Sequence, residues 1–346
     1  MGLPEGSGLT LYSKRKPGKR NLITDVPGVT VGQVTIQDRE INTGVTAILP
    51  HQGNLFQEKV MAGAAVINGF GKSVGLVQIE ELGTIESPII LTNTLSTGTA
   101  LTAMVKYMLA QNPDIGADTG TVNCVVTECN DGRLNDIRGL HVKEEDVLQA
   151  VENAAETFEE GAVGGGTGMV CLGLKGGIGS ASRTFESDGG TYTVGALVMS
   201  NFGEAGNLVI GGRRFDTRKC IEDCKNKDIG SIIMILATDA PLSERQLKRV
   251  AKRAMISLGR VGSYSGNGSG DIAIAFTTAN NQPHYSKKNI LEMKMFYDEN
   301  IDCVFESGVE AVEEAIISSL YHAKTTTGVR GNTYMVLQEF SKRYES

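Results

Sequence analysis

Ser269 lies between two glycines, directly before an apolar run, in the segment NGSGDIAIAF at residues 267–276. The glycine before it, Gly268, permits backbone conformations closed to other residues and leaves the hydroxyl a clear approach to the preceding carbonyl carbon. Attack there would turn the Gly268–Ser269 amide into an ester, and hydrolysis of that ester would cut the chain. Ser269 would then carry a free α-amine, whose pKa of about 7.7–8.0 suits a general base near neutral pH. The pattern indicates a self-processing serine nucleophile, although Asn-Gly-Ser is also typical of an ordinary turn.

Polar side chains that could form a site follow two predicted strands. Glu128 ends the run TVNCVVTE, Asn130 follows it, and Asn201 directly follows the run YTVGALVMS. The sites of α/β proteins tend to collect where strands end. A side-chain amide such as that of Asn201 is suited to an oxyanion or to a substrate amine. We expect all three residues in the site, with turn formation as the alternative role.

The segment 305–320 predicts an amphipathic helix with further candidates. At about 100° per residue, Ser307, Glu310 and Glu314 fall on the face opposite the apolar stripe, whereas Glu313 lies at the stripe's edge. A carboxylate on a buried face needs a partner such as a protonated N-terminal amine. Glu313 is therefore the better partner for the amine of Ser269 by geometry.

We expect no metal and no cofactor. The six cysteines form no disulfide framework, and the four histidines are scattered along the chain. The glycine-rich segment 161–179 could cradle a phosphate, but no strand–GxGxxG–helix context surrounds it. Close packing of backbone against backbone explains these glycines equally well.

Composition narrows the possible partners. The 346 residues carry a net charge of −7 with no long basic tract, which argues against nucleic acid. No run is apolar enough over about 18 residues to cross a membrane, and the N-terminal residues lack a signal-peptide core. We expect a cytoplasmic protein without a membrane partner.

The elements that position these residues alternate along the chain. A β segment with a Pro-Gly turn is predicted around residues 24–36, and strands are predicted around 44–50, 87–94, 121–128, 192–200, 230–242, 270–276 and 332–338. Helices are predicted around 97–109, 145–151, 244–258 and 305–320, with Ser96 or Thr97 capping the first and a capping box SERQ opening the third. Gly259 stands where that third helix should end. The pattern is that of an α/β enzyme.

Twelve stretches, in this order, resemble one family: TDVPGV, GVTAILP, NLFQEKV, NGFGKS, LTNT, ECNDGRLNDIRG, GAVGGGTGM, KGGIGSASR, SNFG, ATDAPLSERQLKR, NGSGD and AVEEAI. The family is that of the DmpA-like aminopeptidases, which includes D-aminopeptidase/D-esterase and β-aminopeptidase members. The resemblance covers nearly the whole chain.

The resemblance implies a four-layer αββα sandwich, similar to N-terminal-nucleophile hydrolases but differently connected. It implies one hydrolase domain over residues 1–346, cut into 1–268 and 269–346, with the processed pairs assembled into homo-oligomers. Ser269 would attack short peptides, amides or esters and release an N-terminal amino acid. Glu128, Asn130 and Asn201 would hold the substrate amine or the oxyanion.

The resemblance also implies a helper serine and glutamate beyond the nucleophile. Ser307 has a suitable spacing, and Glu313 and Glu314 are the carboxylates that follow it. The sequence does not choose among Ser307, Glu310, Glu313 and Glu314. Nor does it reveal a preference for L-, D- or β-amino acids.

Two other functions remain open at this point. An acyltransferase of related architecture would pass the acyl group to an amine instead of water, although the ornithine acetyltransferases use threonine after the cut. A scaffold that never cleaves itself would lack the activity altogether. Fragment analysis and hydrolysis assays with and without an acceptor amine separate the three.

Overall fold

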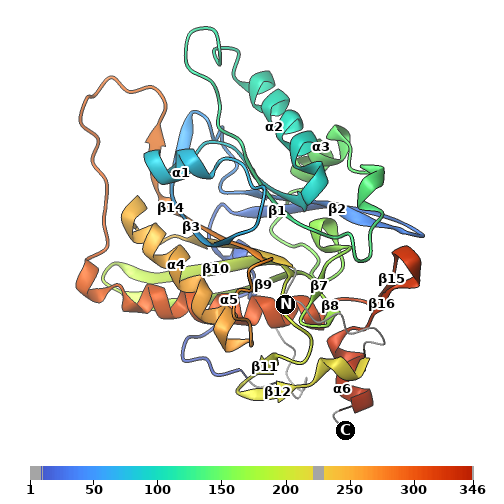
Figure 1. The fold of residues 1–346 in the computed structure, drawn as a ribbon. Helices are drawn as coiled ribbons and strands as arrows, with labels where there is room; N and C mark the ends of the chain where they lie inside the picture. Colours follow the sequence, from blue (N-terminus) through green and yellow to red (C-terminus); the bar gives the residue numbers. More distant parts are fainter. Residues whose placement is uncertain (1–8, 10, 221–229, 345–346) are drawn as a thin grey trace.

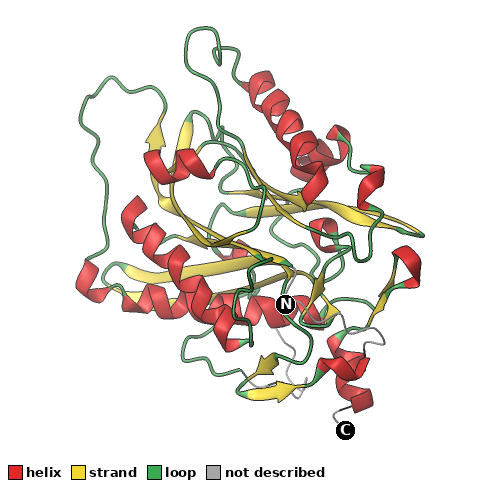
Figure 2. Ribbon diagram, viewed as in Figure 1, coloured by secondary structure: helices red, strands yellow, loops and turns green. Residues whose placement is uncertain are grey.

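The computed structural model describes residues 9, 11–220 and 230–344. Two β-sheets lie face to face, and helices cover both outer faces (Figures 1 and 2). The first sheet has the order β1-β2-β5-β6, in which β5 and β6 run parallel and the other neighbours run antiparallel. Its strands are β1 (Thr30–Asp38), β2 (Ile41–Leu49), β5 (Ile89–Asn93) and β6 (Val125–Cys129), and its helices are α2 (Thr97–Gln111) and α3 (Glu144–Glu152).

The second sheet has the order β4-β3-β14-β13-β10-β9, and β13 and β14 run parallel at its centre. Its strands are β3 (Glu58–Gly69), β4 (Thr84–Ile85), β9 (Gly177–Ser187), β10 (Gly190–Asn201), β13 (Ser231–Thr238) and β14 (Gly270–Pro283). Helices α4 (Glu244–Arg260) and α5 (Asp302–Tyr321) pack on its outer face.

Smaller elements complete the chain. They are α1 (Leu76–Leu82), β7 (Val170–Cys171), β8 (Leu174–Lys175), β11 (Leu208–Ile210), β12 (Arg213–Phe215), β15 (Thr326–Thr327), β16 (Thr333–Tyr334) and α6 (Leu337–Tyr344). None of the helices in the described residues is long and apolar enough to span a membrane.

The central strand β13 shows why the layers form. Its side chains alternate between two apolar cores, so the strand is buried on both faces. Ile233 and Ile235 point into the core between the sheets, whereas Ile232, Met234 and Leu236 point into the core under α4 and α5. A third core joins the first sheet to α2 and α3. Three cores between four layers confirm the predicted α/β class and the αββα sandwich.

Most predicted elements are confirmed, and the local differences have physical reasons. The capping box of α4 forms as predicted, with Ser243 accepting from the backbone N–H of Gln246. At α2 the prediction of Ser96 or Thr97 as the cap is wrong, because the side chain of Asn93 accepts from the N–H groups of Leu95 and Ser96.

The predicted end of the third helix and the predicted last strand also differ from the structure. Helix α4 continues through Gly259 to Arg260. The last predicted strand is reduced to the two residues of β16, and residues from Leu337 onward form α6 because Leu337 and Phe340 pack as one turn of a helix into the core. Part of the polar segment before β13, residues 221–229, lies outside the described residues.

Helix α5 corrects a prediction about exposure. Ser307, Glu310 and Glu314 are buried, not solvent-facing. The reason is tertiary: the N-terminal arm crosses this face, and the hydroxyl of Ser13 donates to Glu310 over 2.6 Å. From β9, Arg183 donates to the carboxylate of Glu314 over 2.5 Å. Helical periodicity cannot reveal a strap that comes from the other end of the chain.

The glycine-rich segment lies between the sheets. A Cβ on Gly166, in the turn Gly164–Gly166, would be 2.4 Å from the backbone nitrogen of Ile178. A Cβ on Gly44 of β2 would be 2.5 Å from the carbonyl oxygen of Gly164. Such contacts are impossible for other residues, so the close-packing interpretation of these glycines is confirmed.

Candidate active site

Four strand ends of the second sheet meet at one edge. In the hydrogen-bond register, Asn201 at the end of β10 pairs with Ser231 at the start of β13. Ser231 pairs with Gly270 at the start of β14, and Gly270 pairs with Gly69 at the end of β3. Residues far apart in the sequence are thereby brought side by side.

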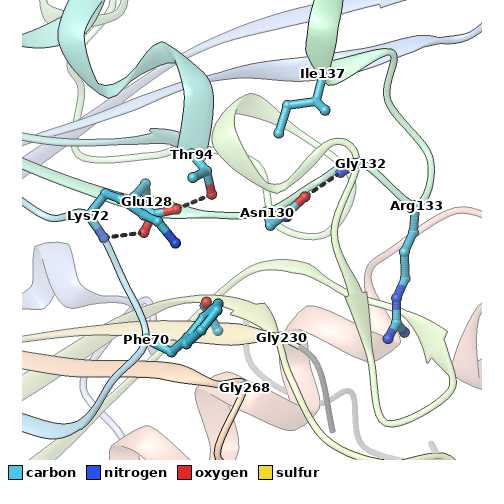
Figure 3. A pocket seen from close by; sticks show the side chains of 11 residues that line it. Phe70, Lys72, Thr94, Glu128, Asn130, Gly132, Arg133, Ile137, Gly230 and Gly268 are labelled. Carbon is cyan, nitrogen blue, oxygen red and sulfur yellow. Dashed lines mark hydrogen bonds between the residues drawn. The ribbon is translucent and has the colours of Figure 1, made fainter. Parts of the chain in front are cut away.

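A cavity of about 360 Å³ opens above this edge. Its walls come from both sheets: Phe70 follows β3, Thr94 follows β5, and Glu128 and Asn130 belong to β6 and the turn after it (Figure 3). Gly230 completes the opposite wall together with the residues around it. The volume falls within the range of small-molecule sites, about 300–1,000 Å³.

Glu128 reaches this cavity from the first sheet. Its carboxylate accepts from the backbone N–H of Lys72 over 2.7 Å and from the hydroxyl of Thr94. The ammonium of Lys72 lies 4.7 Å from the centre of the Phe70 ring. Two short contacts hold the carboxylate in one orientation, as expected of a group that binds a cation.

The two predicted asparagines are linked. The side-chain amide of Asn201 donates to the carbonyl of Asn130 over 2.9 Å and accepts from the N–H of Val170 over 2.9 Å. The side chain of Asn130 is exposed and accepts from the N–H of Gly132 over 2.9 Å. Asn130 thus lines the cavity at a turn, and Asn201 holds that turn from the second sheet.

Ser269 is buried beneath the cavity edge and is 1% exposed. Its hydroxyl donates to the carboxylate of Asp271 over 2.5 Å. Its carbonyl oxygen accepts from the side chain of Asn68 and from the N–H of Phe70. The preceding Gly268 does line the cavity.

A second glycine–serine pair, which the sequence reasoning missed, lines the same cavity. The N–H of Gly270 donates to the carbonyl oxygen of Gly230 over 3.0 Å and to the hydroxyl of Ser231 over 3.2 Å. The signal was available: GSIIMILAT at residues 230–238 is a Gly-Ser pair before an apolar strand, the same pattern that drew attention to Gly268 and Ser269.

The match to a family model decides the identity. Residues 21–334 match the model of Peptidase family S58. The chain belongs to peptidase family S58. The match and the aminopeptidase relatives of this chain confirm the expected family and the expected hydrolase class.

The relatives of this S58 peptidase agree with the match. Two curated relatives are both called β-peptidyl aminopeptidase BapA. The one from Sphingosinicella microcystinivorans is 40% identical, with 95% of this chain and 88% of the relative covered. The one from Sphingosinicella xenopeptidilytica is 35% identical, with 94% and 86% covered.

Three solved structures share the fold. The PH0078 protein from Pyrococcus horikoshii OT3 is 52% identical with a TM-score of 0.91, and 98% of each chain is covered. A β-aminopeptidase from Burkholderia sp. is 38% identical with a TM-score of 0.86, covering 97% and 96%. The L-aminopeptidase D-Ala-esterase/amidase from Ochrobactrum anthropi, described as a variant of the Ntn hydrolase fold, is 38% identical with a TM-score of 0.88, covering 98% of each chain.

The helix residues predicted to assist the nucleophile are held elsewhere in this S58 peptidase. The hydroxyl of Ser307 donates to the carbonyl of Cys303 within α5 over 2.7 Å, and Glu313 pairs with Arg260 over 2.8 Å. Glu314 contacts Arg183 of β9. The strand register aligns Arg183 with Thr277 on β14, seven residues or about 23 Å from Gly270.

Cys129 and Asp131 flank the cavity residue Asn130 in the sequence and are buried, as is Lys175. Burial raises the pKa of the Cys129 thiol well above its ordinary value, and the carboxylates of Glu128 and Asp271 add to the effect. Burial also raises the pKa of Asp131 to about 7 and lowers that of Lys175 to about 7. Cys129 is therefore a poor nucleophile. Within the described residues, no group of three or more His, Cys, Asp or Glu is arranged to hold a metal ion.

Proposed function

We propose that this S58 peptidase is a self-processing aminopeptidase whose nucleophile is Ser231, freed by cleavage of the Gly230–Ser231 bond. One observation carries the proposal: the N–H of Gly270 contacts both the Gly230 carbonyl oxygen and the Ser231 hydroxyl, at a cavity that also contains Glu128. A backbone donor on a carbonyl oxygen stabilises the charge that develops there during attack. At the pair first predicted, Gly268–Ser269, the serine hydroxyl is instead bonded to Asp271.

Self-cleavage proceeds in two steps. The Ser231 oxygen attacks the Gly230 carbonyl carbon, the carbon–nitrogen bond breaks, and the proton of the hydroxyl passes to the departing nitrogen. The product is an ester with a free amine on Ser231. Water then hydrolyses the ester, leaving a carboxylate on Gly230 and a free hydroxyl on Ser231.

Turnover uses the same atoms. The new α-amine of Ser231, with a pKa of about 7.7–8.0, accepts the hydroxyl proton as that oxygen attacks a substrate carbonyl. The substrate's ammonium binds the carboxylate of Glu128, so the carbonyl of the peptide's first residue is the one that acylates Ser231. Loss of the leaving amine gives an acyl-enzyme, which water hydrolyses to release an amino acid.

Ser269 and Asp271 support this chemistry from the neighbouring strand. Gly270, which contacts Ser231, is flanked by these two residues, and their side chains share a 2.5 Å hydrogen bond. We assign them the positioning of the Ser231 amine and hydroxyl. Asn201, at the end of β10, holds the turn of Asn130 through the bond to its carbonyl, and we assign both asparagines to the oxyanion side of the cavity.

The relatives' names support the substrate class, since they include a β-peptidyl aminopeptidase and an L-aminopeptidase D-Ala-esterase/amidase. Short peptides, amides and esters are therefore the proposed substrates. The family resemblance further supports a homo-oligomer of processed pairs, and we keep the expectation from the sequence that the protein is cytoplasmic. Light scattering of the cut protein tests that assembly, and a mass equal to one pair contradicts it.

Intact-mass measurement of the purified, active protein tests the cleavage site. We expect two fragments, residues 1–230 and 231–346. Fragments of 1–268 and 269–346 would return the nucleophile to Ser269, and a full-length chain with aminopeptidase activity would contradict self-processing. Release of p-nitroaniline from aminoacyl p-nitroanilides, with and without an acceptor amine, then distinguishes hydrolysis from acyl transfer.

A further inference from the structure

The cavity carries opposite charges on opposite sides. In Figure 3 Glu128 lies at one side and Arg133 at the other, with Asn130 and Gly230 between them. The ammonium of Lys72 remains on the Glu128 side, over the Phe70 ring. Arg133 is thus the cation at the end of the cavity away from the carboxylate.

The turn that bears Arg133 is held on several sides. The carbonyl of Arg133 accepts from the side chain of Asn332 over 3.0 Å. The N–H groups of Leu134 and Asn135 donate to the carbonyl of Asp131 over 3.0 and 2.9 Å. The backbone of Arg133 is therefore fixed relative to the cavity, which is what a selective contact requires.

We propose that the preferred substrates are free dipeptides, and that Arg133 binds their C-terminal carboxylate. This rests on the proposed function: with the N-terminal ammonium on Glu128 and the scissile carbonyl at Ser231, the second residue points toward Arg133. Two residues span at most about 7 Å, so each residue added after the second moves the C-terminal carboxylate further from the ammonium and changes where it lies in the cavity. A guanidinium matches a carboxylate with two parallel hydrogen bonds, which also makes the contact selective.

The apolar walls agree with this assignment. Phe70 and Ile137 line the same cavity and can contact the side chains of a short peptide without charge selection. Selection then depends on the two ends of the substrate. A C-terminal amide would leave Arg133 without its carboxylate, and a third residue would carry the carboxylate past it.

The test compares free dipeptides with matched substrates on the cut enzyme. Ala-Ala and β-Ala-Ala are measured against their C-terminal amides, against the corresponding tripeptides, and against Ala-Glu-amide, which carries a carboxylate on a side chain. We expect kcat/KM for the free dipeptides to exceed that for the amides by about tenfold or more, chiefly through KM. Equal values would overturn the proposal, and so would a preference for Ala-Glu-amide over Ala-Ala.

Variants locate the contact. Arg133→Gln should lower the ratio of kcat/KM for the free dipeptides to kcat/KM for their amides to about one, and Arg133→Lys should keep part of the preference. Arg138→Gln, on an exposed arginine of the following turn, is the matched control and should keep the full preference. Retention of the preference in a folded Arg133→Gln protein would overturn the proposal.

Failure of this inference differs from failure of the proposed function. A wild-type enzyme that hydrolyses amides and dipeptides equally well is an aminopeptidase without carboxylate selection. An enzyme that is cut but hydrolyses neither class, nor aminoacyl p-nitroanilides, contradicts the proposed function itself.

Discussion

The backbone N–H of Gly270 donates to the carbonyl oxygen of Gly230 over 3.0 Å. Gly270 is the first residue of β14, and Gly230 directly precedes β13, the parallel neighbour of β14. Gly230 is followed by Ser231, and Gly270 follows Ser269. A donor held in place by a sheet needs no reorganisation when charge develops on the carbonyl oxygen. The register of β13 against β14 therefore places this donor on the carbonyl oxygen of the Gly230–Ser231 peptide bond.

The two serines should respond differently to removal of the hydroxyl. Ser231→Ala removes the attacking atom, so we expect an uncut chain with activity lowered at least about a thousandfold. Ser269→Ala removes only a neighbouring group, so we expect slow cleavage before residue 231 and a kcat lowered about a hundredfold. Intact mass and steady-state kinetics measure both. Normal cleavage in Ser231→Ala would disprove the assignment.

Glu128 should control binding of the substrate amine. Glu128→Gln has nearly the same shape, so the side chain can still accept from Lys72 and Thr94, but the negative charge is lost. KM for short peptides should therefore rise about tenfold to a hundredfold. Glu81→Gln, on an exposed glutamate of α1, serves as the control. An unchanged KM in the Glu128 variant would show that the amine binds elsewhere.

Glu314 should matter for stability and not for turnover. It pairs with the buried Arg183 about 23 Å along the sheet from Gly270, and breaking a buried pair costs about 3 kcal/mol or more. Glu314→Gln should therefore lower the melting temperature and leave kcat/KM of the folded enzyme unchanged; Glu299→Gln, on an exposed residue, should change neither. A large loss of activity at an unchanged melting temperature would restore α5 as part of the catalytic machinery.

Asp131 should make stability depend on pH. Burial raises its pKa in the folded protein to about 7, whereas the unfolded chain has the ordinary value near 4. Between these pH values the folded state keeps a proton that the unfolded state has lost. The contribution of Asp131 to the free energy of unfolding therefore falls as the pH rises from about 4 to 7. Asp131→Asn should make the free energy of unfolding depend less on pH in this range.

Thermal melting across that pH range measures the effect. Asp118→Asn, on an exposed aspartate, should keep the wild-type slope. If the Asp131 variant keeps it too, another group binds the proton.

Local patterns predicted much of this protein. Alternating apolar residues, the capping box at Ser243 and the polar ends of the strands are properties of neighbouring residues, so the α/β class and the candidates Glu128, Asn130 and Asn201 could be found without coordinates. The family resemblance supplied the four layers.

The choice between the two Gly-Ser pairs depended on tertiary structure. Ser231 and Ser269 have the same local pattern, and what separates them is the register of β13 against β14 and the wall of the cavity supplied by the other sheet. The exposure of α5 was likewise decided at long range, because an arm 296 residues away in the sequence covers Glu310. Sequence specifies which residue types precede a strand; only the folded chain determines which of them share a cavity, since contacts between distant segments have no periodic signature.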